Sequence, residues 1–202
     1  MSKGTVFIIS GPSGSGKDTI MSALFQRHPE IKLSISSITR EMRVGEVEGE
    51  KYHFISREEF EEQLKNDEFL EHNLFVDNYY GTPKKPVIDC VESGKDIILE
   101  IDVNGAAQVR EKLPEAVSIF IMPPSYEELR RRLIGRGTDA LEVIEKRLAS
   151  SLGEIGRAFE YDYIVKNDIV DRCVDDIIHI IISHRLSCEN QKNLIDEVLN
   201  KC

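Results

Sequence analysis

Residues 11–17 read Gly-Pro-Ser-Gly-Ser-Gly-Lys and directly follow the apolar run Val6–Ile9. A buried strand, a glycine-rich loop and a lysine in this order are typical of a loop that binds the phosphates of a nucleoside triphosphate. Glycines allow positive φ and bring backbone N–H groups close to an anion, while the next helix N-terminus and Lys17 add positive charge. The pattern therefore predicts phosphate contacts from Gly11, Pro12, Ser13, Gly14, Ser15, Gly16 and Lys17.

The residue after the lysine departs from this motif. The motif has Ser or Thr there to ligate Mg²⁺, and this chain has Asp18. Asp18 either approaches the metal, directly or through water, because carboxylates bind Mg²⁺ well, or it is an acid of the first helical turn while Thr19 supplies the hydroxyl. The residues alone leave both interpretations open.

Composition and charge limit the class of protein. The 202 residues suit one domain with one sizeable core, and their formal net charge of −10 argues against nucleic acid or an anionic membrane as a partner. No run of about 18 apolar residues predicts a membrane span, and the N-terminus leaves no room for a signal peptide. The four cysteines show no CxxC spacing, so we expect free thiols in a cytoplasmic protein, either a monomer or a homodimer.

Strand and helix patterns alternate along most of the chain. Strands are expected at 5–10, 96–102, 117–121 and 161–165, and helices at 17–27, 103–112, 125–134, 139–158 and from about 169 onward. Buried apolar strands separated by helices predict an α/β fold with a parallel sheet and helices on both faces. The 36–90 region lacks this rhythm and is interpreted as an insertion, with extended segments at 52–55, 69–76 and 79–81 and helices at 56–65 and 83–93.

Two acids stand at the end of the strand expected at 96–102. Glu100 and Asp102 are two residues apart, so their side chains would share one face of that strand. Ligands of open parallel sheets bind beyond the carboxyl ends of the strands, where the phosphate loop also lies. Asp102 is therefore either a metal-positioning carboxylate or a cap of the next helix.

Arginines provide the cations that a phosphoryl-transfer site needs, because such sites work mostly by positioning and charge neutralisation. Arg40 and Arg43 stand in a polar segment, and neither has an obvious i+4 carboxylate partner on a helix. Arg136 stands between two glycines at the end of an Arg-rich helix, and Arg147 follows on the next helix. The glycine hinge predicts a lid that closes over the triphosphate and excludes water.

Taken with further motifs in order, these residues resemble those of the guanylate kinases, P-loop nucleoside monophosphate kinases. The resemblance covers nearly the whole chain and is carried by Ser10–Gly16, Ser36–Arg43, Gly45–Phe54, Glu68–Glu71, Asn78–Thr82, Ile98–Gly105 and Gly135–Thr138. It implies one domain, 1–202, with a P-loop core (1–35, 91–129 and 158–202), a GMP-binding lobe (36–90) and a mobile lid (130–157). It also implies ATP and GMP as small-molecule partners and Mg²⁺ as the cofactor.

The resemblance further implies roles for individual residues. ATP would contact the loop through Asp18 and Thr19, with Asn167 beside adenine. The catalytic residues would be Lys17, Arg40, Arg43, Arg136 and Arg147. GMP would be bound by Ser36, Arg40, Arg43, Glu46, Tyr52, Glu71, Tyr80, Thr82, Glu100 and Asp102, and the metal by Asp18 and Asp102.

The roles expected for Glu71 and Thr82 agree with the hydrogen-bonding groups of guanine. Guanine presents N1–H and N2–H₂ donors beside an O6 acceptor, so the Glu71 carboxylate can accept from both donors and the Thr82 hydroxyl can donate to O6. Adenine presents the opposite pattern, and buried groups left unpaired reject it. Thr82 replaces the Ser that is more usual in the family, which keeps the hydroxyl and adds a methyl group.

Three functions are compatible with these motifs. The first is ATP-dependent phosphorylation of GMP, and also of dGMP, to the diphosphate in purine nucleotide metabolism. The second is a ribose 1,5-bisphosphate kinase, because those relatives share the fold and can carry Gly-Lys-Asp in the loop, although they have no use for a guanine-reading pair. The third is a non-catalytic guanylate-kinase-like binding module, although such modules have generally lost parts of the phosphate loop that this chain retains.

Overall fold

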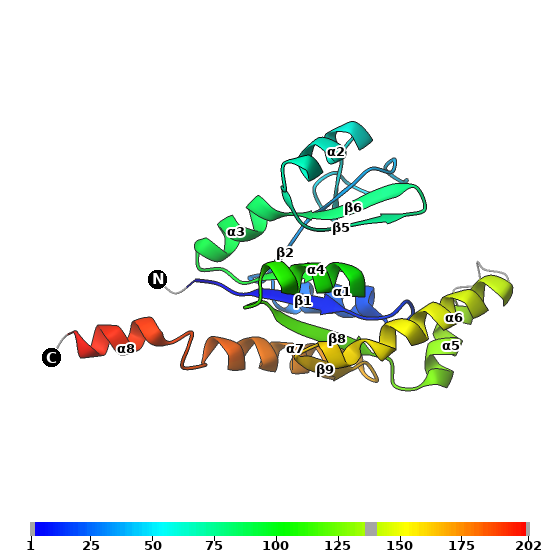
Figure 1. The fold of residues 1–202 in the computed structure, drawn as a ribbon. Coiled ribbons are helices and arrows are strands. Elements are labelled where there is room, and N and C mark those ends of the chain that lie inside the picture. Colours follow the sequence, from blue (N-terminus) through cyan, green and yellow to red (C-terminus); the bar gives the residue numbers. More distant parts are fainter. Residues whose placement is uncertain (1–2, 136–140, 201–202) are drawn as a thin grey trace. The chain divides into compact units, whose positions relative to one another are not determined.

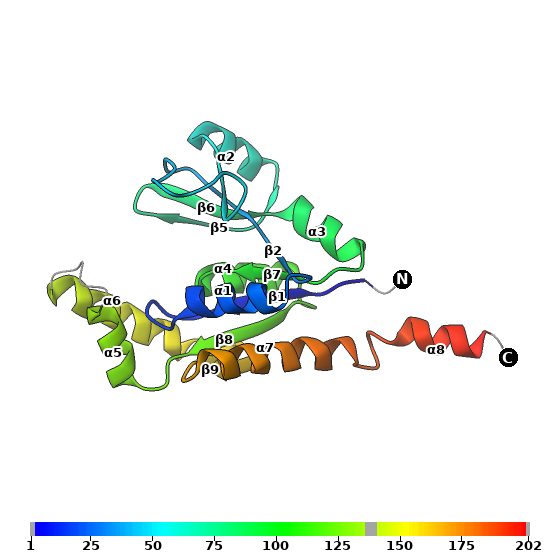
Figure 2. The same cartoon turned by 180° about the vertical axis from the view of Figure 1, so that it is seen from behind.

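The computed structural model describes residues 3–135 and 141–200, which form two compact units (Figures 1 and 2). Unit 1 comprises Met1–Lys3, Ile9–Ile31 and Ser118–Cys202, and unit 2 comprises Gly4–Ile8 and Lys32–Val117. The strand β1 (Val6–Ser10) contributes residues to both units. It is the middle strand of a five-stranded sheet with the order β2-β7-β1-β8-β9.

Unit 1 contains the phosphate loop and most of the helices. The helix α1 (Lys17–Arg27) follows the loop, and β8 (Val117–Met122) pairs in parallel with β9 (Tyr163–Lys166). The helix α7 (Val170–Arg185) packs against α1 and β9. The helices α5 (Tyr126–Ile134) and α6 (Leu141–Gly156) pack together through a buried apolar cluster of Leu129, Leu133, Ile144 and Leu148. A 3₁₀ turn (Ala158–Glu160) and α8 (Lys192–Leu199) complete this unit.

Unit 2 contains the other end of the parallel sheet and a separate small sheet. The strand β2 (Lys32–Leu33) pairs in parallel with β7 (Ile97–Glu100), and α3 (Lys84–Glu92) and α4 (Val103–Lys112) flank β7 in sequence. The small sheet has the order β4-β3-β6-β5, made from β4 (Tyr52–Phe54), β3 (Ser36–Ile38), β6 (Asn78–Pro83) and β5 (Phe69–Phe75). The helix α2 (Arg57–Lys65) packs on β6, beside which it lies in Figure 2.

The predicted α/β class is confirmed, and most expected elements are present within a few residues. The start of α2 illustrates why: the Ser56 hydroxyl accepts a hydrogen bond from the Glu59 N–H at 3.0 Å and caps the helix, as Ser followed by two acids predicts. Cys90, Cys173 and Cys188 are free thiols, as expected, while Cys202 lies outside the described residues. In the described part of the chain, no helix is long and apolar enough to cross a membrane.

Three expectations are wrong. The strand expected at 96–102 ends at Glu100, because Asp102 is the N-cap of α4. No strand is expected between residues 36 and 51, yet this polar stretch begins with β3, whose three residues are too few to produce a period-2 pattern. The helical segment expected from about 169 onward is divided into α7 and α8. Side-chain amides of Asn190 and Gln191 donate to the carbonyls of His184 and Arg185, which end α7.

Candidate functional site

The phosphate loop has the backbone conformation that its glycines permit. Gly14 and Gly16 both have φ near +88°, and Gly16 is the N-cap of α1. A Cβ on Gly16 would lie 2.4 Å from Nδ2 of Asn167, and one on Gly14 would lie 3.0 Å from the Leu129 side chain. Both glycines are therefore required by the backbone angle and by the close approach of other elements of unit 1.

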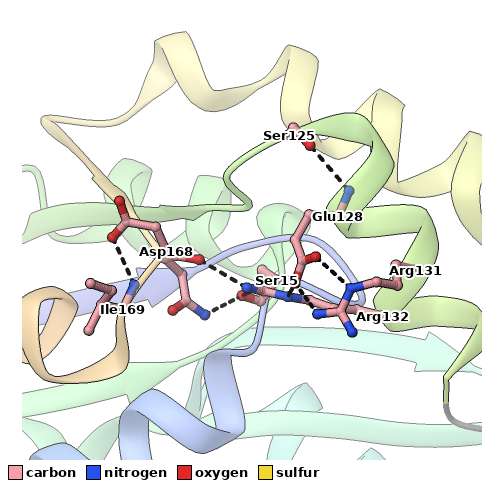
Figure 3. Close-up of polar contacts among 8 residues, drawn as sticks. Ser15, Ser125, Glu128, Arg131, Arg132, Asp168 and Ile169 are labelled. Carbon is pink, nitrogen blue, oxygen red and sulfur yellow. Dashed lines mark hydrogen bonds and ion pairs between the residues drawn. The ribbon is translucent and has the colours of Figure 1, made fainter.

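Side chains from α5 and from the end of β9 hold the loop (Figure 3). The Ser15 carbonyl accepts hydrogen bonds from Asn167 Nδ2 at 2.6 Å and from an Arg132 guanidinium nitrogen at 3.0 Å. Arg132 also donates to the Asn167 carbonyl at 3.1 Å and pairs with Glu128 at 2.7 Å. In addition, the Ser151 hydroxyl of α6 donates to the Ser13 carbonyl at 3.1 Å. These contacts hold the carbonyls of Ser13 and Ser15 in place.

Arg132 and Ser151 are residues that the sequence reasoning missed. Glu128 lies four residues before Arg132, which is the spacing of a helical ion pair, but no local signal connects either residue to a loop more than 110 positions away. The pairing of Arg132 with Ser15 depends on tertiary structure alone.

The first turn of α1 carries the residues that follow the loop. Lys17 is half-buried, whereas Asp18 and Thr19 are both exposed. The buried Ser15 hydroxyl has no hydrogen-bond partner among the described residues. Buried hydroxyls in proteins are normally paired, so a group that enters this loop would find an acceptor or donor already present.

The small sheet of unit 2 gathers five predicted GMP-binding residues on one face. Residues directly opposite each other in neighbouring strands share a face, and so do residues two apart in one strand. Ser36 is paired with Tyr52, and Glu71 with Thr82, while Tyr80 stands two residues before Thr82. The rings of Tyr52 and Tyr80 are in edge contact with their centroids 6.5 Å apart.

Glu71 is the most unusual of these residues, because its side chain is a carboxylate that is only 5% exposed. Its Oε1 accepts a hydrogen bond of 2.6 Å from the Thr82 hydroxyl. The pKa of Glu71 is raised from 4.5 to about 7, chiefly by burial and also by the nearby Asp102 charge, which together outweigh the lowering effect of the Thr82 hydrogen bonds. The carboxyl thus titrates near neutral pH in the unliganded protein.

Arg40 lies beside the same face and is held by Glu46. Two guanidinium nitrogens of Arg40 contact the two carboxylate oxygens at 2.7 and 2.6 Å, and the Arg40 guanidinium lies 5.5 Å from the ring centroids of Tyr52 and Phe54. The pair lowers the pKa of Glu46 to about 2, chiefly through the Arg40 hydrogen bonds.

The carboxylate partner of Arg40 is thus six residues away in a loop, where the search for a partner four residues away on a helix does not find it. Glu46, expected among the GMP-binding residues, also contacts Arg43. It accepts the Arg43 backbone N–H at 2.8 Å, but its ion pair is with Arg40.

Asp102 uses its carboxylate within unit 2. Oδ1 accepts from the backbone N–H groups of Asn104 and Gly105 at 2.9 and 2.7 Å, and Oδ2 accepts from Asn73 Nδ2 at 2.9 Å. This geometry is that of the helix cap. Glu100 ends β7 and acts electrostatically on the half-buried Tyr52, whose pKa is raised mainly by desolvation.

The remaining predicted residues are only partly described. Arg147 lies half-buried on α6, and Arg43 is exposed. Arg136 lies outside the described residues. Asp18 belongs to unit 1 and Asp102 to unit 2, so joint metal binding by these two carboxylates remains a prediction.

The strand–loop–helix arrangement on a parallel sheet flanked by helices defines this chain as an α/β protein of the P-loop class. The family model described as guanylate kinase matches residues 3–184. Similar proteins include "Guanylate kinase" of Clostridioides difficile (strain 630), 46% identical over 96% of this chain and 95% of that one. "Guanylate kinase" of Escherichia coli (strain K12) is 44% identical over 100% of this chain and 98% of that one.

A solved structure agrees with the sequence matches. The crystal structure of guanylate kinase from Anaplasma phagocytophilum superposes with a TM-score of 0.75 and 36% identity, covering 93% of this chain and 89% of that one. The chain belongs to the guanylate kinase family.

Proposed function

We propose that this protein transfers the γ-phosphoryl group of ATP directly to the phosphate of GMP, giving ADP and GDP. Phosphotransfer from ATP to GMP is the activity of the family to which the chain belongs. The proposal extends to the residues involved, to in-line transfer without a covalent intermediate, and to dGMP as a second acceptor, because no residue proposed here reads the ribose 2′-hydroxyl.

The main support for guanine as the base of the acceptor is the buried, hydrogen-bonded pair of Glu71 and Thr82. A buried carboxylate is expensive to retain unless a ligand or another charge uses it. We propose that Glu71 accepts from N1–H and N2–H₂ of guanine, and that the Thr82 hydroxyl, which donates to Glu71 in this structure, turns to donate to O6 when guanine binds. Ser36, Tyr52 and Tyr80 share the face, and Arg40 lies over the Tyr52 ring, which suits an aromatic base linked to a phosphate.

We propose that the acceptor phosphate is bound by Arg40 and Arg43, with Glu46 holding Arg40 in place. The donor triphosphate would be bound by the loop from Gly11 to Lys17 and by Asp18, Thr19 and Asn167, with Arg136 and Arg147 neutralising charge from the lid. This division supports in-line transfer, because catalysis of phosphoryl transfer needs two positioned phosphate chains and little covalent chemistry from the protein.

Mg²⁺ is the metal expected with ATP. The described residues include no group of three or more His, Cys, Asp or Glu that could hold a metal alone. Mg²⁺ commonly takes one or two protein carboxylates and fills its shell with phosphate and water oxygens, and the exposed Asp18 carboxylate after Lys17 fits this mode. Asp102 fits less well, because both of its oxygens accept hydrogen bonds within unit 2. Bound Mg²⁺ would neutralise phosphate charge.

A coupled assay of ADP formation tests the proposal. ATP is offered with GMP, AMP and ribose 1,5-bisphosphate in turn, and turnover is expected with GMP only. Glu71→Ala should lower kcat/KM for GMP about 100-fold while KM for ATP changes by less than about twofold, because two hydrogen bonds to a buried charge are lost. Glu68→Ala, which removes an exposed carboxylate three residues earlier, is the matched control. Turnover of ribose 1,5-bisphosphate but not GMP would refute the proposal.

A further inference from the structure

One face of α4 follows β5 along its length. The residues at this face are spaced three or four apart, at Gly105, Gln108 and Lys112, and so lie on one side of the helix. Lys112 Nζ donates to the Phe69 carbonyl at 2.8 Å, and the cap residue Asp102 accepts from the Asn73 side chain at 2.9 Å. The helix therefore contacts β5 on both sides of Glu71.

Gln108 makes the most specific of these contacts. Its Oε1 accepts from the His72 backbone N–H at 3.1 Å, and its Nε2 donates to the His72 backbone carbonyl at 2.9 Å. The strand β5 is the edge of its sheet, so some of its peptide groups have no strand to pair with. The Gln108 amide pairs with His72 as a neighbouring strand would, at the residue directly after Glu71.

Gly105 brings the same helix against the Glu71 carboxylate itself. A Cβ at position 105 would lie 2.7 Å from Oε2 of Glu71 and 3.1 Å from its Cδ. The absence of a side chain at Gly105 thus creates the space that the carboxylate occupies. Thr82 contacts the other oxygen, so the carboxylate is held between β6 and α4.

We propose that Gln108 is a positioning residue for base selection: by binding both peptide groups of His72, it fixes β5 against α4 so that Glu71 faces guanine. This inference rests on the proposed role of Glu71 in reading guanine. Gln108 binds the backbone of His72, the neighbour of Glu71 in β5, so its loss should change how the base is recognised and leave ATP binding unaltered.

The test replaces Gln108 with Met, which has a similar length and cannot form either hydrogen bond. The acceptors are GMP and IMP, whose base lacks the 2-amino group and so has less to lose when Glu71 shifts. Gln108→Met should lower kcat/KM for GMP about tenfold, as expected for hydrogen bonds of ordinary strength, and that for IMP by less than about threefold. KM for ATP should stay within about twofold. Glu111→Met, on the exposed side of the same helix, should change none of these values.

The outcomes separate this inference from the proposed function. Failure of the wild-type protein to phosphorylate GMP would refute the function itself. Wild-type turnover combined with an unchanged preference for GMP over IMP in Gln108→Met would refute the role of Gln108 alone. Should Gln108→Met lack a cooperative unfolding transition, Gln108→Glu provides the second variant. It retains the acceptor for the His72 N–H, so a smaller loss of GMP preference is expected, and an unchanged preference would overturn the proposal.

Discussion

The buried carboxyl of Glu71 should make the stability of this protein depend on pH in a way that one substitution removes. Its pKa is raised from 4.5 to about 7 in the folded chain, chiefly by burial. The folded state therefore binds more protons than the unfolded state between these two values. Stability contributed by this group is present below pH 4.5 and is lost as the pH rises to about 7. Glu71→Gln keeps the size of the side chain and removes its titration.

The size of the effect follows from the difference between the two pKa values. At about 1.4 kcal/mol per pH unit, a rise from 4.5 to about 7 corresponds to about 3 kcal/mol. The free energy of unfolding of Glu71→Gln, minus that of the wild type, should therefore increase by about this amount between pH 4.5 and 8. The variant gains stability at neutral pH while it loses GMP turnover, as expected when a buried charge is retained for function.

Urea denaturation at intervals between pH 4.5 and 8 measures this difference directly, with fluorescence or circular dichroism as the signal. Glu68→Gln is the control, because it removes an exposed carboxylate from the same segment. A difference between wild type and Glu71→Gln that stays constant with pH would show that Glu71 is not a buried carboxyl of raised pKa. The same conclusion would follow if Glu68→Gln reproduced the pH-dependent change.

Three other substitutions test the remaining contacts. Arg132→Met removes one of two donors to the Ser15 carbonyl and should raise KM for ATP about five- to tenfold with little effect on KM for GMP; equal changes in both values would contradict this role. Glu46→Gln weakens the ion pair that holds Arg40 and should raise KM for GMP severalfold at pH 7. A change confined to KM for ATP would contradict the proposal that Glu46 holds Arg40 for GMP binding. Asp18→Ser should keep activity while altering its dependence on Mg²⁺ concentration in a metal titration, and complete inactivity of a folded variant would reveal a different role for Asp18.

The sequence predicted correctly those helices and strands whose ends are set by neighbouring residues, such as a capping side chain or the end of an apolar run. Helix α4 was predicted at 103–112, the bounds it has, because an acidic cap precedes it and an apolar strand ends before it. The strand was extended two residues too far into Asp102, because alternation of acids along a strand and an N-cap look alike in one dimension. The short strand β3 and the break between α7 and α8 depend on pairing and on side-chain amides that periodicity does not reveal.

The sequence by itself determined the glycine-rich P-loop and the α/β class of this chain, and from the loop it predicted phosphate binding. Gly14, Gly16, Lys17 and the buried strands allow this because they act through local backbone geometry and charge. Tertiary structure alone decided how the site is held. Asn167 reaches Ser15 across 152 residues of sequence, and Gln108 reaches His72 across 36. The same applies to the pKa of Glu71, since burial is created by the packing of β5, β6 and α4 rather than by any neighbour in the chain.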